Sequence, residues 1–211
     1  RLTGERGDYL NYLRAAFYEY ARHDNLVYHG YAGHLLIPGI SHVIKIRVIA
    51  DVEDRVRTAM NRHGLDRKSA LARVKQVDRE RGEWMRFLFG VDWNDPTLYD
   101  VVVNISRLGV DGACDVVLAA AGLDAFRPTA QSRQAVEDLI LANRVWITLA
   151  QDPSTEGASV KVVAQNGRVT ITGQAISWDI ADAIQRVASG VDGVTDVKSE
   201  VNVNPLYATP I

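Results

Sequence analysis

Val43-Ile-Lys-Ile-Arg-Val-Ile-Ala50 is the stretch that decides the fold of this 211-residue chain. It is β-branched and almost continuously apolar, as expected for a parallel strand that is covered on both faces. A helix is predicted from about Val52 to His63, with Gly64 closing it as a C-terminal cap. A second helix is predicted from about Asp66 through the 80s, followed by a loop at Asp92–Pro96.

The segments on either side continue this alternation. A second buried strand is predicted at Tyr99–Ile105, with a helix at Val110–Ala121 after it. Upstream, the sequence predicts an amphipathic helix at Asp8–His23, a short strand at Asn25–Gly30 and a loop at Tyr31–Ile40. Buried strands that alternate with loops and helices predict an α/β fold with a parallel sheet.

Beyond a predicted linker at Gly122–Ala130, the pattern changes. Helices are predicted at Ser132–Ala150 and Ser177–Ser189, and strands at Val160–Ala164, Val169–Thr172 and Val194–Val203. Asn166-Gly167 separates two β-rich runs, which is a strong hairpin signal because a type I′ turn needs two positive φ angles. The order αββαβ predicts a three-stranded sheet covered by two helices.

The charge distribution limits the partners. A net charge of −2 argues against a nucleic-acid partner. The segment Arg62–Arg86 holds eight Lys/Arg against four Asp/Glu, a local excess that suits a small anionic ligand. From Thr129 onward, six Lys/Arg stand against nine Asp/Glu, which disfavours strong binding to anionic lipid.

The cysteine content and the hydropathy indicate a compartment. Cys114 is the single cysteine, so an intrachain disulfide is impossible, and its apolar helical surroundings predict a buried, inert thiol. Neither a signal peptide nor an apolar run near the roughly 18 residues of a membrane span is present. These features predict a cytoplasmic protein.

The C-terminal segment resembles a known family. Val169-Thr-Ile-Thr-Gly173 after the Asn-Gly turn, followed by Gly190-Val-Asp-Gly-Val-Thr-Asp-Val197, is similar to a BON domain. The resemblance covers residues 130–205. It implies a sensing or interaction module that binds a phospholipid surface or a small ligand.

The N-terminal segment resembles the cytidylate-kinase-like family of P-loop phosphotransferases over residues 1–127. The resemblance lies in an ordered set of pieces: Asn25-Leu-Val-Tyr-His-Gly30, Val43 to Ala50, Val52-Glu-Asp-Arg-Val56, Val77-Asp-Arg-Glu-Arg81, Asp92-Trp-Asn-Asp-Pro96 and Leu98-Tyr-Asp-Val-Val-Val-Asn-Ile-Ser106. It implies part of a parallel-sheet P-loop fold. It also implies a nucleotide partner and ATP-dependent phosphoryl transfer to a nucleoside monophosphate, with ATP and Mg²⁺ as cofactors.

The resemblance also implies roles for particular residues. Arg55 and Arg62, seven apart on one helix face, would hold the donor nucleotide and its phosphates. Arg79 and Arg81, with Asp78, fall in the segment that resembles the family's lid and would clamp phosphate oxygens, which suits the planar guanidinium fork. The alternative is a solvated helix face with local ion pairs such as Asp78–Arg81.

Gly30-Tyr31 stands where the family usually has Gly-Arg, at the place that would contact the acceptor nucleotide. Tyr31 cannot make that charged contact, because its side chain is neutral. The identity of the acceptor, and activity itself, therefore stay open at this position.

The sequence contains no G-x-x-x-x-G-K-[ST] phosphate loop. Two explanations stay open: the motif lies upstream of these residues, or the chain is a degenerate relative that lacks it. A kinase-like sheet without its central strand should be compensated by repacking or by a second copy, so a homo-oligomer is expected and a bare edge at Val43–Ala50 is not. The two function hypotheses are an enzyme and a non-catalytic binding protein.

Overall fold

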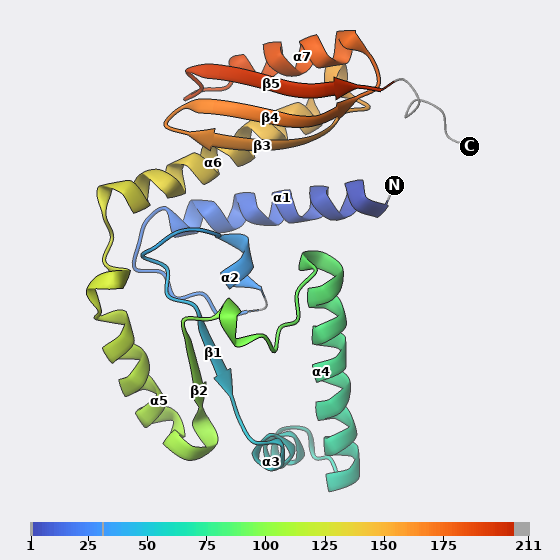
Figure 1. Cartoon of the computed structure of the whole chain (residues 1–211). Coiled ribbons are helices and arrows are strands. Elements are labelled where there is room, and N and C mark those ends of the chain that lie inside the picture. The colour runs from blue at the N-terminus through green and yellow to red at the C-terminus, as the bar shows by residue number, and fades with distance from the viewer. Residues whose placement is uncertain (1, 31, 205–211) are drawn as a thin grey trace. The chain divides into compact units, whose positions relative to one another are not determined.

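A computed structural model of the chain describes residues 2–30 and 32–204, and its contacts divide it into two compact units. Unit 1 combines Arg1–Gly30 with Thr129–Ile211, and unit 2 is Tyr31–Pro128. Figure 1 shows the elements in chain order. In the described part of the chain, no helix is both long enough and apolar enough to cross a membrane.

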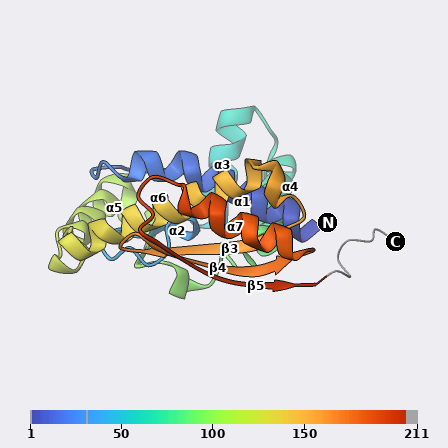
Figure 2. The ribbon, with the colours of Figure 1, turned by 90° about the horizontal axis from the view of Figure 1, so that it is seen from above.

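Unit 1 contains the predicted αββαβ arrangement. Its strands β3 (Ser159–Gln165), β4 (Arg168–Ala175) and β5 (Asp196–Val203) form a sheet in that order, in which β3 and β4 are antiparallel and β4 and β5 are parallel. Helices α6 (Ala130–Gln151) and α7 (Trp178–Ser189) cover one face of this sheet (Figures 1 and 2). The apolar core between sheet and helices consists of Leu141, Val145, Leu149, Val169, Ile171, Ala175, Ile184, Ala188 and Val191.

The local signals in unit 1 act as expected. Asn166 and Gly167 have φ angles of 50° and 82°, so the predicted type I′ turn joins β3 to β4. Thr129 and Ser132 form a reciprocal capping box at the start of α6, and the Ser177 side chain caps α7. A short 3-10 helix, η3 (Pro153–Thr155), links α6 to β3.

Helix α1 (Leu2–Ala21) lies against α6 in unit 1. The reason is that α6 carries two buried stripes. Leu141, Val145 and Leu149, spaced four apart, face the sheet. A second stripe includes Asn143 and Trp146, which are 7% and 9% exposed and contact α1. An isolated αββαβ fold would leave the second stripe in water.

The contacts between α1 and α6 are both polar and aromatic. The Asn143 side-chain amide donates to the backbone carbonyl of Asn11 at 3.0 Å. The rings of Tyr12 and Trp146 meet edge to face, with centroids 5.8 Å apart. Just beyond α1, the Arg22 guanidinium donates two hydrogen bonds of 2.8 Å to the Glu137 carboxylate.

Replacing Asn143 by alanine should destabilise the chain by about 1–2 kcal/mol, because a buried hydrogen bond between α1 and α6 is lost. Chemical denaturation followed by circular dichroism measures this change. The control is Gln134→Ala on the same helix, where the side chain is exposed and the effect should stay within about 0.5 kcal/mol. Equal effects from the two variants would contradict the packing of α1 on α6.

Unit 2 is an α/β arrangement around two parallel strands. Its elements in order are α2 (Gly33–Leu36), β1 (Ile46–Ile49), α3 (Val52–His63), α4 (Arg67–Phe89), the 3-10 helix η1 (Pro96–Leu98), β2 (Val101–Asn104), α5 (Ile105–Ala121) and the 3-10 helix η2 (Asp124–Phe126). Strands β1 and β2 pair in parallel, with Ile46 opposite Val101. This confirms the parallel sheet, and Gly64 caps α3 with a φ of 64°, as predicted.

Two local predictions are wrong. Asn25–Gly30 is not a strand: Asp24 and Asn25 have φ angles of 54° and 52°, which are incompatible with extended backbone, and Val27 is 94% exposed. The predicted loop at Tyr31–Ile40 contains the short helix α2, and Tyr31 itself lies outside the described residues.

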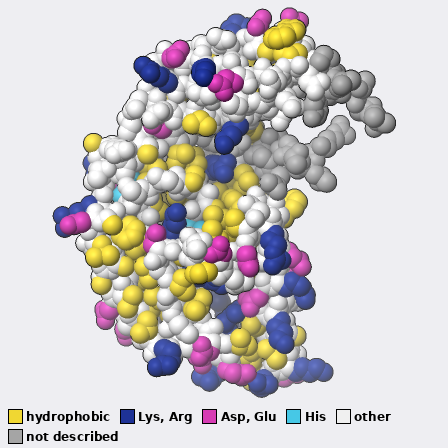
Figure 3. All heavy atoms as spheres, in the orientation of Figure 1, with side chains coloured by type: hydrophobic (Ala, Val, Ile, Leu, Met, Phe, Trp, Pro, Cys, Tyr) yellow, Lys and Arg dark blue, Asp and Glu magenta, His cyan; other side chains and the backbone are white. Residues whose placement is uncertain are grey.

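The sheet of unit 2 is less covered than its sequence predicts. Among the described residues, β1 and β2 have only each other as strand partners. Val48, Ile49 and Val102 are 58%, 37% and 43% exposed, so the expectation of a strand covered on both faces is wrong for this chain. Figure 3 shows apolar side chains gathered over these strands and α5.

Cys114 on α5 is exposed, which corrects the expectation of a buried thiol.

His34 gives unit 2 a predicted pH dependence. Its ring stacks on Tyr99 with centroids 4.7 Å apart, and burial, followed by the nearby Lys45 charge, lowers the pKa of His34. As pH falls, the imidazole of His34 takes up a proton in the unfolded chain before it does so in the folded chain. The stability that neutral His34 contributes is therefore complete above about pH 6.5 and is lost as pH falls through the lowered pKa of the folded state.

Thermal melting of wild type and His34→Phe between about pH 7.5 and about pH 5.5 checks this dependence. The melting temperature of the variant should fall less than that of wild type, because the phenylalanine keeps the ring contact and has no proton to bind. Parallel falls in both proteins would show that His34 does not cause the dependence.

Candidate functional site

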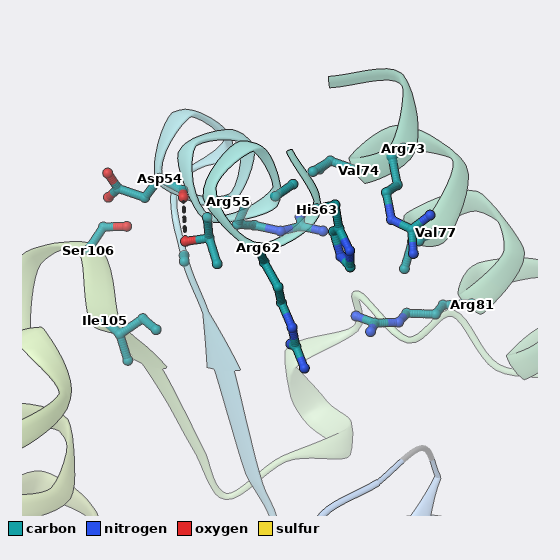
Figure 4. A pocket seen from close by; sticks show the side chains of 13 residues that line it. Asp54, Arg55, Arg62, His63, Arg73, Val74, Val77, Arg81, Ile105 and Ser106 are labelled. Atoms are coloured by element: carbon teal, nitrogen blue, oxygen red, sulfur yellow. Dashed lines mark hydrogen bonds between the residues drawn. The ribbon is translucent and has the colours of Figure 1, made fainter. Parts of the chain in front are cut away.

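A cavity of about 510 Å³ lies in unit 2, between α3 and α4 at the carboxyl ends of β1 and β2 (Figure 4). In open parallel sheets this end of the strands is where ligands bind. The lining residues are Ala50, Asp54, Arg55, Thr58, Ala59, Arg62, His63, Arg73, Val74, Val77, Arg81, Ile105 and Ser106. The cavity is called the arginine pocket below.

Polar contacts fix the strand ends beside the arginine pocket. The Asn104 amide at the end of β2 donates to the Asp51 carboxylate at 3.1 Å, and the Asp51 backbone N–H donates to the Ser106 hydroxyl at 2.8 Å. Asn104 also caps α5 by accepting from the Ser106 N–H at 2.9 Å. The first turns of α3 and α5 are therefore held to one another at this edge of the sheet.

Four arginines line the pocket, two from each helix. Arg55 and Arg62 come from α3, and Arg73 and Arg81, eight residues apart and so on one face, come from α4. Figure 4 shows Arg62 and Arg81 extending into the space between the helices. Asp54 is the one carboxylate among the described lining residues, so this lining carries a positive excess and suits an anion.

The charge of Arg55 is already paired within the protein. Its guanidinium donates to both carboxylate oxygens of Asp78, at 2.8 and 2.5 Å, and this hydrogen bonding raises the pKa of Arg55. Both side chains are about one-third exposed. The pair therefore joins α3 to α4 beside the pocket.

Arg62 and Arg73 have no carboxylate partner among residues 9–30 and 32–204, whose side chains the structure describes. Both side chains belong to exposed positions, and both line the pocket. Two guanidinium groups without a counter-charge are therefore available to an anionic ligand.

The predicted site residues are placed in three groups. Arg55, Arg62 and Arg81 line the pocket, and Asp78 supports it through Arg55. Arg79 is exposed and outside the lining, since two residues along a helix turn the side chain by about 200° from Arg81.

The two predicted acceptor-site residues do not join this group. Gly30 belongs to unit 1 and is not among the residues that line the pocket. Tyr31 lies outside the described residues.

Sequence reasoning missed Arg73 and His63, which also line the pocket. The signal for Arg73 was present: Arg73, Val77 and Arg81 follow each other at four-residue intervals on a predicted helix. His63 directly follows Arg62 at the end of α3, and only the position of α4 brings both helices around one cavity.

The described side chains of the pocket do not by themselves form a cage for Mg²⁺. Mg²⁺ prefers near-octahedral oxygen ligands, which proteins supply through one or two carboxylates together with substrate phosphates. The pocket offers only Asp54, and no cluster of three or more metal-binding side chains occurs in the described parts of the chain. The chemistry of the pocket's own side chains is that of an anion site.

Comparison with known families agrees with both resemblances. Residues 5–107 match the cytidylate kinase-like family, and residues 137–205 match the BON domain. The first match covers most of α1, all of α2, α3 and α4, and both strands of unit 2. By sequence, helix α1 thus belongs to the segment that matches the cytidylate kinase-like family. In the structure it packs in unit 1, against α6.

Individual relatives match parts of the chain. A cytidylate kinase from Halobacterium salinarum is 36% identical over 86 residues, which is 40% of this chain and 43% of that protein. A cytidylate kinase from Methanocaldococcus jannaschii is 31% identical over 106 residues, 48% and 58% respectively. A 21 kDa hemolysin from Actinobacillus pleuropneumoniae is 36% identical over 67 residues, 31% and 34% respectively. The chain thus spans between one third and just over half of these relatives.

A solved structure is also similar over part of the chain. The uncharacterized protein from Eubacterium ventriosum aligns with a TM-score of 0.41 and 24% identity, over 43% of this chain and 50% of that one. A likeness at this level adds nothing to the assignment of the two segments.

Proposed function

We propose that the arginine pocket binds the phosphate groups of a nucleotide. The chain joins a cytidylate kinase-like segment (residues 5–107), which contains this pocket, to a BON domain (residues 137–205). In the whole protein this segment would take part in ATP-dependent phosphoryl transfer to a nucleoside monophosphate. The observation that supports the proposal is the convergence of four arginines at the carboxyl ends of two parallel strands.

Each arginine has a distinct proposed role. Arg62, Arg73 and Arg81 would contact phosphate oxygens, because phosphoryl transfer needs positive charge around the transferred group. Arg55 and Asp78 would hold α3 and α4 together, so that the other three guanidinium groups stay at the distance of one polyphosphate. Arg79 would contact ligand only if α4 turned, since its side chain faces away from the pocket.

The acceptor site belongs to the same proposal. Gly30 and Tyr31 would contact the acceptor nucleotide, as the kinase-like resemblance implies. ATP and Mg²⁺ would be the cofactors of the whole protein, with the metal held mainly by the ATP phosphates.

The second candidate function is a non-catalytic binding protein, in which the kinase-like segment is a scaffold and the BON unit recognises a ligand or partner. The observation that favours it is that these 211 residues contain no G-x-x-x-x-G-K-[ST] sequence. Both candidates share an anion-binding pocket and differ in phosphate transfer.

Calorimetric titration with ATP, adenosine and CMP, together with an assay of phosphate transfer from ATP to CMP by the whole protein, separates the two candidates. ATP should bind and adenosine should not, because the pocket recognises phosphate. Transfer to CMP would support the enzyme. ATP binding without transfer would select the scaffold, and equal binding of ATP and adenosine would contradict the phosphate site.

The BON domain would serve as a sensing or binding module for a small ligand or a phospholipid. A cavity of about 630 Å³ lies beside the C-terminal end of α6, and its described lining includes Trp146, Asp152 and Glu156 but neither lysine nor arginine. Such a lining suits a neutral or cationic small ligand better than an anionic headgroup.

We therefore expect no preference of the protein for anionic over neutral vesicles. Sedimentation with vesicles of phosphatidylcholine alone or with added phosphatidylserine measures this. Binding that rises with the phosphatidylserine content, and falls with salt, would contradict the expectation.

Self-association is also part of the proposal. The exposed apolar side chains of Val48, Val102, Val110 and Leu118 lie on the strands and on α5, where a second copy would cover them. Light scattering coupled to size-exclusion chromatography should give a mass above the 23.3 kDa of one chain. A mass equal to one chain at all concentrations would contradict a homo-oligomer.

A further inference from the structure

Trp93 lies in the segment Asp92-Trp-Asn-Asp-Pro96. None of these five residues is among those that line the arginine pocket. Its side chain is half-buried, although it belongs to a surface loop between α4 and β2. The loop is tied internally, because the Asp92 carboxylate accepts from the Asn94 N–H at 3.0 Å and Asp95 accepts from the Thr97 N–H at 2.9 Å. An ordered loop can hold an aromatic ring at a fixed place.

Strand β1 anchors Trp93 through Arg47. The Arg47 guanidinium donates to the Trp93 carbonyl at 2.6 Å and to the Asn94 side chain at 2.8 Å. Its central carbon lies 4.8 Å from the centroid of the indole and 5.5 Å from the Tyr99 ring. The Tyr99 hydroxyl donates to the same Trp93 carbonyl at 2.9 Å. The backbone and the ring of Trp93 are thus both fixed to the sheet.

The same indole reaches α4 at the turn that carries Arg81. The Arg81 guanidinium carbon lies 6.0 Å from the centroid of the Trp93 ring, at the outer limit of a cation–π contact. A Cβ placed on Gly82 would lie 3.7 Å from the indole nitrogen of Trp93, so the ring approaches the helix backbone next to Arg81. Trp93 is therefore the contact between the anchored loop and a pocket arginine.

We propose that Trp93 is a positioning residue, which holds the Arg81 guanidinium in the arginine pocket for a phosphate group of the ligand. The inference rests on the proposed function, because it assigns Arg81 to phosphate. An aromatic face suits the task, since the π face of the ring attracts the guanidinium and limits where it lies. Arg62, on α3, has no cation–π contact with a ring that the structure describes, and it serves as the internal comparison.

ATP affinity in a set of single and double variants tests the proposal. Trp93→Leu should weaken ATP binding about 3- to 10-fold, and Trp93→Phe should recover most of the loss because it keeps an aromatic face. In an Arg81→Ala background, Trp93→Leu should add less than about 2-fold, whereas in an Arg62→Ala background its full effect should remain. An equal effect of Trp93→Leu in both backgrounds would overturn the proposal, since it would mark a general structural defect.

A readout without ligand separates this inference from the proposed function. The chain has four tryptophans, and the indole N–H signal of Trp93 can be identified in a nitrogen-15 NMR spectrum by its loss in Trp93→Phe. Arg81→Ala should shift this signal and Arg62→Ala should leave it in place. An unchanged signal in Arg81→Ala would overturn the contact. A shifted signal in a protein that binds no ATP would contradict the proposed function while the contact stands.

Discussion

Gly173→Ala should destabilise the chain by at least about 3 kcal/mol, a loss large enough to unfold unit 1 well below the melting temperature of wild type. A Cβ at this position would lie 2.2 Å from the Ser159 carbonyl oxygen and 2.9 Å from the Val160 Cα. Both are backbone atoms of the paired strand β3, so no side-chain rotation relieves the clash. The φ of 144° at Gly173 adds strain for any residue with a Cβ.

Gly190→Ala is the matched control for Gly173→Ala. Gly190 lies in the same unit, its φ is −82°, and the nearest atom to an added Cβ is 3.5 Å away, so the substitution should change stability by less than about 1 kcal/mol. Thermal melting followed by far-ultraviolet circular dichroism measures both variants. A melting temperature of Gly173→Ala within about 2 °C of wild type would contradict the register of β3 on β4.

Removing pocket arginines should abolish nucleotide binding stepwise. Arg62→Ala and Arg81→Ala should each weaken ATP binding about 10- to 100-fold, because a charge-assisted contact to phosphate is worth about 1.5–3 kcal/mol. The double variant should bind ATP too weakly for calorimetry. Arg73→Ala should fall in the same range, although the sequence reasoning did not select it.

Arg79→Ala is the control for the arginine variants. It removes the same charge from the same helix but lies outside the pocket lining, so ATP affinity should change by less than about 3-fold. A loss as large as that of Arg81→Ala would mean that long-range charge, and not contact in the pocket, determines binding. It would also favour the original assignment of Arg79 to the phosphates.

Much of the fold could be predicted because its signals are local. The Asn166-Gly167 turn, the Gly64 cap and the αββαβ order each depend on a few adjacent residues, and the structure confirms them. The strand predicted at Asn25–Gly30 failed because apolar content alone cannot supply a pairing partner. The apolar run at Val43–Ala50 indicated burial on both faces, which one neighbouring strand cannot provide.

The site could be predicted only in part, for a physical reason. Helical spacing places Arg55 and Arg62 on one face of α3. No sequence pattern reveals that Asp78 on α4 forms an ion pair with the Arg55 guanidinium. Likewise, the proximity of Trp93 to Arg81 depends on where the loop before β2 returns to α4. Contacts between elements need the tertiary structure, and these contacts decide which arginines remain available.

Hydrogen–deuterium exchange with and without ATP is the most direct test of the claim that the arginine pocket binds nucleotide phosphates. Peptides that cover residues 52–81, on α3 and α4, should exchange more slowly when ATP is present, and adenosine should cause no such protection. Protection confined to residues 130–204, or equal protection by ATP and adenosine, would contradict the account.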